Sequence, residues 1–261
     1  MNQTLLITGP PGCGKTTWIH KTLMEHPGPK GYIRLAGPEE DGIEQATDGG
    51  IDQAWLCDQI PELKTFESLE KIDKTYEDSL LLIEAQQVIS PNKDSHNRIH
   101  QSIQFELLTL NINVSKSLHF GRDAELPTQD TLEFKKLESW DYDLNGEVWD
   151  PNSLSSFWFE LVNGAYGDVY RAKALTNLPD GRSFYCNWIV SQQGSQFLPL
   201  DTLEAPIGRP KRVSRLVIQG KALNRDEILV TIDDCLLSDN ILELQQATLR
   251  QQANYSTSFS Q

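Results

Sequence analysis

The chain has 261 residues, of which 38% are hydrophobic and 23% are charged, and its formal net charge is −14. These values are typical of a globular protein with two modest domains or one large one. A charge this negative provides no basic field that would attract a nucleic acid or an anionic membrane. No apolar run in the sequence approaches the length that spans a bilayer. We therefore expect no nucleic-acid partner and no membrane partner.

The cysteine pattern indicates a reducing compartment. The four cysteines are widely spaced and form no C-x-x-C pair; they are Cys13, Cys57, Cys186 and Cys235. Such spacing does not predict a disulfide framework. The sequence also enters an expected strand at once, without the pattern of a signal peptide. The expected location is the cytoplasm.

A phosphate-binding motif follows the first expected strand, which covers residues 3–8. The pattern G-x-x-x-x-G-K-[ST] is filled at every fixed position by Gly9, Gly14, Lys15 and Thr16. Residues 18–24 continue as an expected helix, so the motif has the strand and the helix that it requires. The sequence therefore predicts binding of a nucleoside triphosphate, either GTP or ATP, with Mg²⁺.

Each residue type in this motif has a chemical role. Glycines let successive N–H groups point at phosphate oxygens, and the helix N-terminus adds free donors and the positive end of its dipole. We expect Lys15 to act as a catalytic charge on the β- and γ-phosphates and the Thr16 hydroxyl to bind Mg²⁺. The expected nucleotide-binding residues are Gly9, Pro10, Pro11, Gly12, Cys13, Gly14, Lys15, Thr16 and Thr17.

The next segments add a strand, an acidic loop and a helix. Residues 32–36 form an expected strand, and the glycine-rich acidic loop 37–50 follows it. This loop either places a carboxylate near Mg²⁺ or is a solvated turn. Leucines and isoleucines with interleaved charges predict a surface helix over residues 61–76.

The apolar run 79–84 is the strongest buried strand after the first, and it ends in Glu84. A buried strand that ends in a carboxylate is typical of a Walker-B strand, whose acid holds the Mg²⁺ shell or orients the attacking water. We therefore expect Glu84 to be catalytic and to lie near Mg²⁺. The alternative is a core strand whose last residue meets solvent.

The sequence changes character near residue 127. We expect strands at 131–140 and 214–220, helices at 151–162 and 225–237, and a β-hairpin of 167–175 with 184–190. The predicted fold class is α/β, with a phosphate-loop domain of mostly parallel sheet at 1–127 and a smaller α+β domain at 128–238. The Gln- and Ser-rich segment 239–261 is predicted to be a disordered tail.

Three stretches resemble one family. The stretch Val169-Tyr170-Arg171-Ala172-Lys173-Ala174 is similar to a strand of the C-terminal domain in CobW-type GTPases, and Ser214–Leu223 with Asp233–Leu237 resembles the end of that domain. With the phosphate loop, the resemblance covers most of the chain. It implies a P-loop GTPase fold followed by a CobW C-terminal-like domain. It further implies a metallochaperone-like role in handling zinc, cobalt or a related metal for a client enzyme.

The chain also departs from the family pattern. Only Cys57 stands where the family has its C-x-C-C metal site, and one thiolate does not build a four-coordinate zinc site. Gln87 replaces a switch glycine between Glu84 and Pro91. The guanine-reading pattern N-K/T-K-x-D is missing, because Asn92-Lys93-Asp94 is followed by Ser95. His96 and His100, four residues apart, are a candidate metal pair or part of a polar surface segment.

These observations leave three functions open. The favoured one is a slow NTP hydrolase, GTPase before ATPase, that assists metal or cofactor handling and contacts a client through its C-terminal domain. The second is a nucleotide-binding adaptor or scaffold without turnover. The third is an ATP-using P-loop protein such as a small-molecule kinase.

Overall fold

The computed structural model describes residues 3–9, 12–35, 38–39, 42–43, 50–72, 78–85, 103–120, 137–192 and 194–258. The chain divides into two compact units, which we call unit 1 (Met1–Lys136) and unit 2 (Leu137–Gln261). Among the helices in these described ranges, none has the length and the apolar character that crossing a membrane requires.

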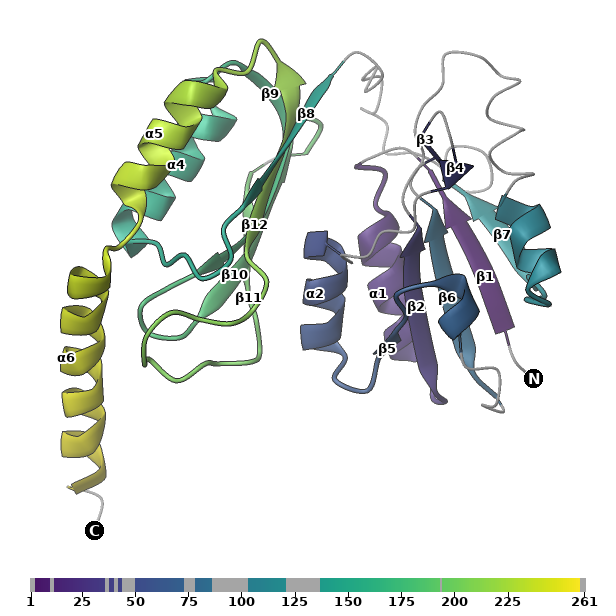
Figure 1. Cartoon of the computed structure of the whole chain (residues 1–261), viewed down its shortest axis with the longest axis horizontal. Coiled ribbons are helices and arrows are strands. Elements are labelled where there is room, and N and C mark those ends of the chain that lie inside the picture. The colour runs from purple at the N-terminus through teal and green to yellow at the C-terminus, as the bar shows by residue number, and fades with distance from the viewer. Residues whose placement is uncertain are drawn as a thin grey trace. The chain divides into compact units, whose positions relative to one another are not determined.

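Unit 1 is an α/β structure (Figure 1). Its described elements are β1 (Gln3–Thr8), α1 (Lys15–Glu25), β2 (Lys30–Leu35), β3 (Pro38–Glu39), β4 (Gly42–Ile43), α2 (Gly50–Gln59), β5 (Lys64–Thr65), the 3-10 helix η1 (Leu69–Lys71), β6 (Leu80–Ala85), a helical segment at 103–109, and β7 (Lys116–His119). The strands expected at 3–8, 32–36 and 79–84 are confirmed as β1, β2 and β6.

Five strands of unit 1 form one parallel sheet in the order β5-β2-β6-β1-β7. From β1 the chain passes to β2 on one side, whereas from β6 it crosses β1 to reach β7 on the other side. The strand order therefore reverses beside β1. In open parallel sheets, ligands bind at the carboxyl edge where this reversal occurs. A parallel sheet of this kind fits a P-loop NTPase.

The alternation of side chains along the strands gives the sheet two different faces. Leu6, Ile33 and Ile83 are buried with Leu69 of η1 and Leu107 of the 103–109 segment, and they form the core on one face. The intervening residues point to the opposite face, because successive side chains in a strand alternate. This second face is the one that Lys15 of α1 meets.

Residues 61–72 differ from the prediction of a helix over 61–76. They form the two-residue strand β5 and the short η1, while 73–77 lie outside the described residues. Lys64 and Thr65 pair with Gly31 and Tyr32 of β2. The edge of the sheet takes these residues as a strand, which an isolated pattern of leucines and charges does not reveal.

Unit 2 is built on an antiparallel sheet. Its elements are β8 (Glu138–Asp143), α4 (Pro151–Val162), β9 (Asp168–Asn177), β10 (Ser183–Ile189), β11 (Gln196–Pro199), β12 (Arg215–Lys221), α5 (Arg225–Cys235) and α6 (Asp239–Ser258). The strand order is β11-β10-β9-β12-β8. The expected hairpin, the 214–220 strand and both expected helices are confirmed. Of the strand expected at 131–140, only 137–140 are described, and 138–140 open β8.

Helices α4 and α5 cover one face of this sheet (Figure 1), and their apolar residues share its core. Asp150 caps α4, because its carboxylate accepts a hydrogen bond from the Ser153 N–H at 2.9 Å, and Pro151 occupies the first turn. Asn224 caps α5 in the same way through the Glu227 N–H. Local capping signals therefore place both helices where the sequence predicts them.

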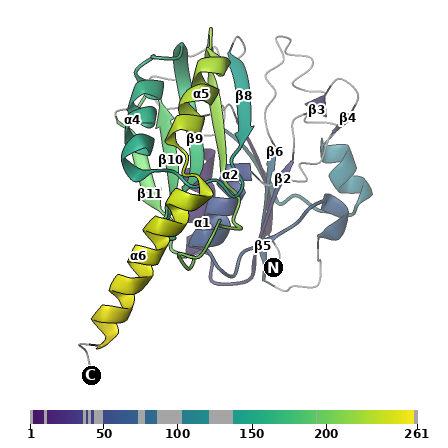
Figure 2. The same cartoon turned by 60° about the vertical axis from the view of Figure 1, so that its left-hand side comes forward.

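Of the segment 239–261, which is predicted to be a disordered tail, residues 239–258 are instead the 20-residue helix α6, which follows α5 (Figure 2), and residues 259–261 lie outside the described residues. The Gln246 side chain is 3% exposed and exchanges two hydrogen bonds with the backbone of Gly208. The Arg250 guanidinium donates to the Pro206 carbonyl oxygen at 2.8 Å. These contacts with a distant loop stabilise a segment that its composition alone predicts to be unstructured.

Candidate functional site

The motif loop joins the end of β1 to the start of α1, at the carboxyl edge of the parallel sheet. Gly9, Gly12 and Gly14 have positive φ angles of 152°, 79° and 88°. The helix begins at Lys15, with Gly14 in a left-handed conformation at its N-cap. Glycine is the residue that adopts such angles without strain. Pro10 and Pro11, two expected binding residues, lie outside the described residues.

Gly9 is also required by its surroundings. A Cβ atom at this position would lie 2.7 Å from Cβ of Phe120 and 3.0 Å from Sγ of Cys13. The first distance is shorter than Cβ contacts in folded proteins, and the second is tighter than nearly all of them. The Gly9 backbone therefore packs closely against Phe120 and Cys13.

The Lys15 side chain turns back from α1 toward the start of the loop. Its ammonium donates a hydrogen bond to the Gly9 carbonyl oxygen at 2.8 Å and lies 3.7 Å from Sγ of Cys13. It also lies 3.9 Å from the Glu84 Oε1 atom, and its side chain is only 10% exposed. The structure thus brings together Lys15 and Glu84, the two residues that the sequence predicts to be catalytic.

Glu84 reaches this position because β6 is the immediate neighbour of β1. It is in register with Ile7 of β1 on one side and with Arg34 of β2 on the other. It is 3% exposed, so it does not end its strand in solvent. A buried carboxylate needs partners, and Lys15 provides one of them.

The second partner of Glu84 is Tyr32, which sequence reasoning missed. The buried Tyr32 hydroxyl donates to the Glu84 Oε2 atom at 2.6 Å. Burial raises the pKa of Tyr32 well above its ordinary value, and the Glu84 charge raises it further. The hydroxyl therefore stays protonated and serves as a fixed donor. A buried tyrosine in an otherwise apolar strand is the signal that could have indicated a polar partner.

A second ion pair continues this charged row on β2. The Arg34 guanidinium lies 3.9 Å from the Asp52 Oδ2 atom of α2, and Asp52 is 4% exposed. A Cβ atom on Gly50, the first residue of α2, would lie 3.0 Å from Arg34 Nη1. Charges of alternating sign therefore extend from the motif loop across β6 and β2 to α2.

Cys13 is buried in the loop, where its thiolate form is disfavoured. Burial raises the pKa of its thiol, and the Lys15 charge opposes this shift only in part. A protonated thiol is a poor nucleophile and a poor metal ligand. Cys13 therefore serves to pack the loop against Gly9.

The carboxyl edge holds one more polar pair that the sequence did not indicate. The Thr8 hydroxyl and the His119 Nδ1 atom are 2.8 Å apart, and they lie opposite each other in the register of β1 and β7. Both strands end here, so this pair lies at the carboxyl edge beside the start of the loop. It ties β7 to the strand that carries the motif.

The oxygen donors at this edge are compatible with Mg²⁺. Thr16 is partly buried and Thr17 exposed in the first turn of α1, and the Glu84 carboxylate lies behind Lys15. Hydroxyl and carboxylate oxygens are the hard ligands that Mg²⁺ prefers. In the described part of the chain, no group of three or more His, Cys, Asp or Glu side chains is arranged to hold a metal ion.

Cys57 lies on α2, and burial raises the pKa of its thiol. Several other candidates fall outside the described residues. These are Gln87, Pro91, the segment 92–95, His96, His100 and most of the acidic loop 37–50.

No protein-family model matches the chain, and no curated protein matches it. Two solved structures are similar to it. One is the Zn(II)-bound YjiA GTPase from E. coli, with 13% identity and a TM-score of 0.31 over 90% of this chain and 99% of that chain. The other is a Zn(II)-bound triple mutant of YjiA GTPase, with 14% identity and a TM-score of 0.30 at the same coverage. TM-scores this low do not establish a shared fold, so the motif and the geometry of unit 1 carry the functional assignment.

Proposed function

We propose that unit 1 binds a nucleoside triphosphate through the loop Gly9–Thr17 and hydrolyses it slowly. The observation that carries this proposal is the position of the Lys15 ammonium. It lies between the Gly9 carbonyl oxygen at 2.8 Å and the Glu84 carboxylate at 3.9 Å, at the carboxyl edge of a parallel sheet. A lysine held there by a glycine loop and a helix N-terminus suits the β- and γ-phosphates of a nucleotide.

The remaining residues would each have a separate role around the phosphates. Gly12 and Gly14 open the loop so that backbone N–H groups reach phosphate oxygens, and the Thr16 hydroxyl binds Mg²⁺. Mg²⁺ supplies charge neutralisation for the β- and γ-phosphates when it is bound. Glu84 accepts hydrogen bonds from the Mg²⁺ shell or from the attacking water, and Tyr32 fixes the rotamer in which it does so.

The finer assignment rests on the sequence resemblance to CobW-type GTPases. It favours GTP over ATP and a role in the handling of a metal or a cofactor for a client protein. Unit 2 would contact that client, since the resemblance to the CobW C-terminal domain lies in β9, β12 and α5. The missing base-reading pattern favours a weaker discrimination between GTP and ATP.

One observation favours a second function, a nucleotide-binding adaptor without turnover. Both Glu84 oxygens already have partners, Lys15 and Tyr32, and the residue is 3% exposed. A carboxylate enclosed in this way has few lone pairs left to orient a water molecule. Gln87 in place of a switch glycine points in the same direction.

Single-turnover phosphate release, measured with Mg²⁺ and either GTP or ATP, separates these two functions. We expect slow release by the unmodified protein, faster with GTP than with ATP. Glu84→Gln should retain nucleotide affinity and slow the release by roughly 10²-fold. Glu25→Gln, which alters an exposed carboxylate on α1, is the matched control. Nucleotide binding without any release, even in the unmodified protein, would refute hydrolysis and support the adaptor.

A further inference from the structure

The ion pair between Lys15 and Glu84 is enclosed by the protein. The Lys15 ammonium lies 3.9 Å from the Glu84 Oε1 atom, and the two side chains are only 10% and 4% exposed. Water and salt screen a pair in such surroundings much less than they screen a pair on the surface. In this arrangement, the charge of Lys15 therefore compensates the charge of Glu84.

Glu84 is the fixed partner of this pair. Its strand β6 lies between β1 and β2, where Glu84 is in register with Ile7 and Arg34. The Tyr32 hydroxyl holds the Oε2 atom through a hydrogen bond of 2.6 Å. Lys15, in contrast, reaches Glu84 from the first turn of α1 through a flexible four-carbon side chain. The lysine is therefore free to change partners, whereas the carboxylate stays in place.

A nucleotide needs the same ammonium. In the function proposed above, Lys15 pairs with the β- and γ-phosphates. A charge that is engaged by phosphates compensates Glu84 less, and a buried carboxylate without a compensating cation is strongly unfavourable. The next cation along the sheet, Arg34, already lies 3.9 Å from the Asp52 carboxylate. Glu84 therefore opposes the binding of phosphates as long as no other cation replaces Lys15.

We propose that Lys15 exchanges partners when a nucleotide binds, from the Glu84 carboxylate to the phosphates, and that Glu84 thereby makes nucleotide binding depend on Mg²⁺. This inference rests on the proposed function, because it requires a nucleotide in the motif loop. Without a divalent cation, Glu84 competes for Lys15 and weakens binding. When Mg²⁺ compensates Glu84, Lys15 becomes available to the phosphates. The affinities for nucleotide and for Mg²⁺ are then coupled through one carboxylate.

Nucleotide affinity in the absence of Mg²⁺ tests this exchange most directly. The full chain is titrated calorimetrically with a non-hydrolysable GTP analogue, once in EDTA and once in Mg²⁺. In EDTA, we expect Glu84→Gln to bind about tenfold more tightly than the unmodified protein, because a neutral amide does not compete for Lys15. Addition of Mg²⁺ should raise the affinity of the unmodified protein by about tenfold more than that of the variant. A substitution that merely damaged the site would weaken binding instead.

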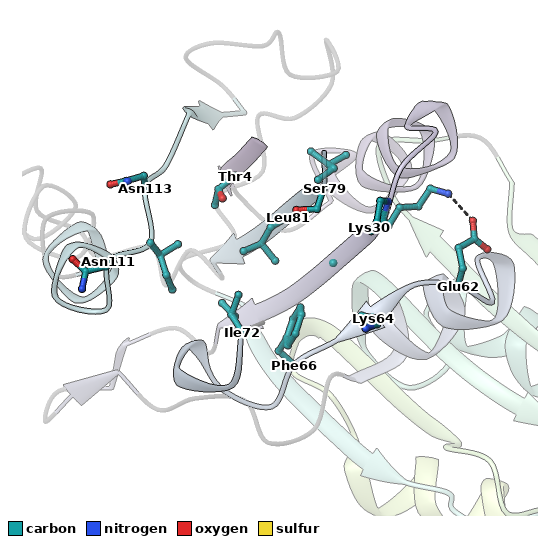
Figure 3. Close-up of a pocket in the computed structure, with 14 residues that line it drawn as sticks. Thr4, Lys30, Glu62, Lys64, Phe66, Ile72, Ser79, Leu81, Asn111 and Asn113 are labelled. Atoms are coloured by element: carbon teal, nitrogen blue, oxygen red, sulfur yellow. Dashed lines mark hydrogen bonds and ion pairs between the residues drawn. The ribbon is translucent and has the colours of Figure 1, made fainter. Parts of the chain in front are cut away.

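The pair of Lys30 and Glu62 provides a matched control. Its charged atoms are 2.5 Å apart, and it lies at the amino edge of the same sheet, opposite the motif loop (Figure 3). Both residues line a hollow of about 310 Å³, together with Lys64. Glu62→Gln removes the same charge from a lysine–glutamate pair of the same unit, but outside the proposed nucleotide site. This variant should bind the analogue as the unmodified protein does in both buffers.

The outcomes separate this exchange from the proposed function. Thermal unfolding shows whether Glu84→Gln has folded, and we expect that it has, because the amide oxygen still accepts the Tyr32 hydroxyl. If the unmodified protein binds no nucleotide in either buffer, the proposed function is wrong and this inference falls with it. If the unmodified protein binds equally well in EDTA and in Mg²⁺, or if Glu84→Gln gains no affinity in EDTA, only the exchange is overturned.

Discussion

Glu84 shows how one residue depends on contacts that come from three different segments. Its carboxylate is approached by Lys15 from α1 and by Tyr32 from β2, while its own strand lies beside β1. The phosphate-loop motif and the apolar run identify Lys15 and Glu84 as candidate site residues, because both patterns are local in sequence. Tyr32 was not predictable, because its bond to Glu84 exists only once β2 pairs with β6.

The Tyr32→Phe substitution tests the value of this bond. Removing the hydroxyl leaves Oε2 of a buried carboxylate without its donor, so we expect the free energy of unfolding to fall by about 1–3 kcal/mol. Chemical denaturation measures this loss, with Tyr170→Phe at a partly exposed ring as the control. If Tyr32 positions Glu84, phosphate release should also slow while the nucleotide affinity is kept. Unchanged stability and unchanged release would show that the bond has no role.

His20 gives unit 1 a dependence on pH. Its ring lies on α1 with its centroid 4.8 Å from that of Trp55, and burial lowers its pKa below the ordinary value of 6.5. As the pH falls, the unfolded chain binds this proton before the folded chain does, so stability is present above the unfolded pKa and is lost below it. We predict that the free energy of unfolding falls as the pH drops below 6.5, the ordinary pKa of the ring. In denaturant titrations at several pH values, the free energy of unfolding of His20→Phe should depend less steeply on pH than that of the unmodified protein. An equally steep dependence would mean that other groups cause the loss.

At the scale of elements, prediction succeeded where the signal was local. The phosphate-loop pattern predicted β1 and α1, and local sequence patterns predicted α4, α5 and the hairpin of β9 and β10. It failed at residues 61–72 and at α6, where distant partners decide the structure. β5 forms by pairing with β2, and α6 is fastened to the loop around Gly208. Neither contact can be predicted from composition alone.

The Gln246→Ala substitution tests the attachment of α6. The Gln246 side chain accepts from the Gly208 N–H at 2.7 Å and donates to the Gly208 carbonyl oxygen at 2.9 Å. Alanine removes both hydrogen bonds to the exposed Gly208 backbone, so we expect a loss of roughly 1 kcal/mol in the free energy of unfolding. Gln251→Ala, at an exposed position of the same helix, is the control. Hydrogen exchange of the α6 amides should become faster only in Gln246→Ala, and equal exchange in the two variants would contradict this account.

At the scale of the molecule, the chain combines a parallel α/β unit with an antiparallel unit whose sheet is covered by two helices. The two edges of the parallel sheet have different chemistry. The carboxyl edge carries the glycine loop with Lys15 and Glu84, and the amino edge carries the hollow with Lys64. The loop was predictable from four spaced residues, whereas the hollow was not, because its lining comes from segments far apart in the sequence.

We propose above that Lys15 and its loop bind a nucleoside triphosphate. Calorimetric titration with non-hydrolysable analogues of GTP and ATP, in the presence of Mg²⁺, tests this claim without requiring turnover. We predict one binding site in the unmodified protein and in Lys21→Ala, and an affinity lower by more than about 100-fold in Lys15→Ala, because no other cation of the motif replaces its charge. Absence of binding by the unmodified protein, or equal affinity in Lys15→Ala, would contradict the claim.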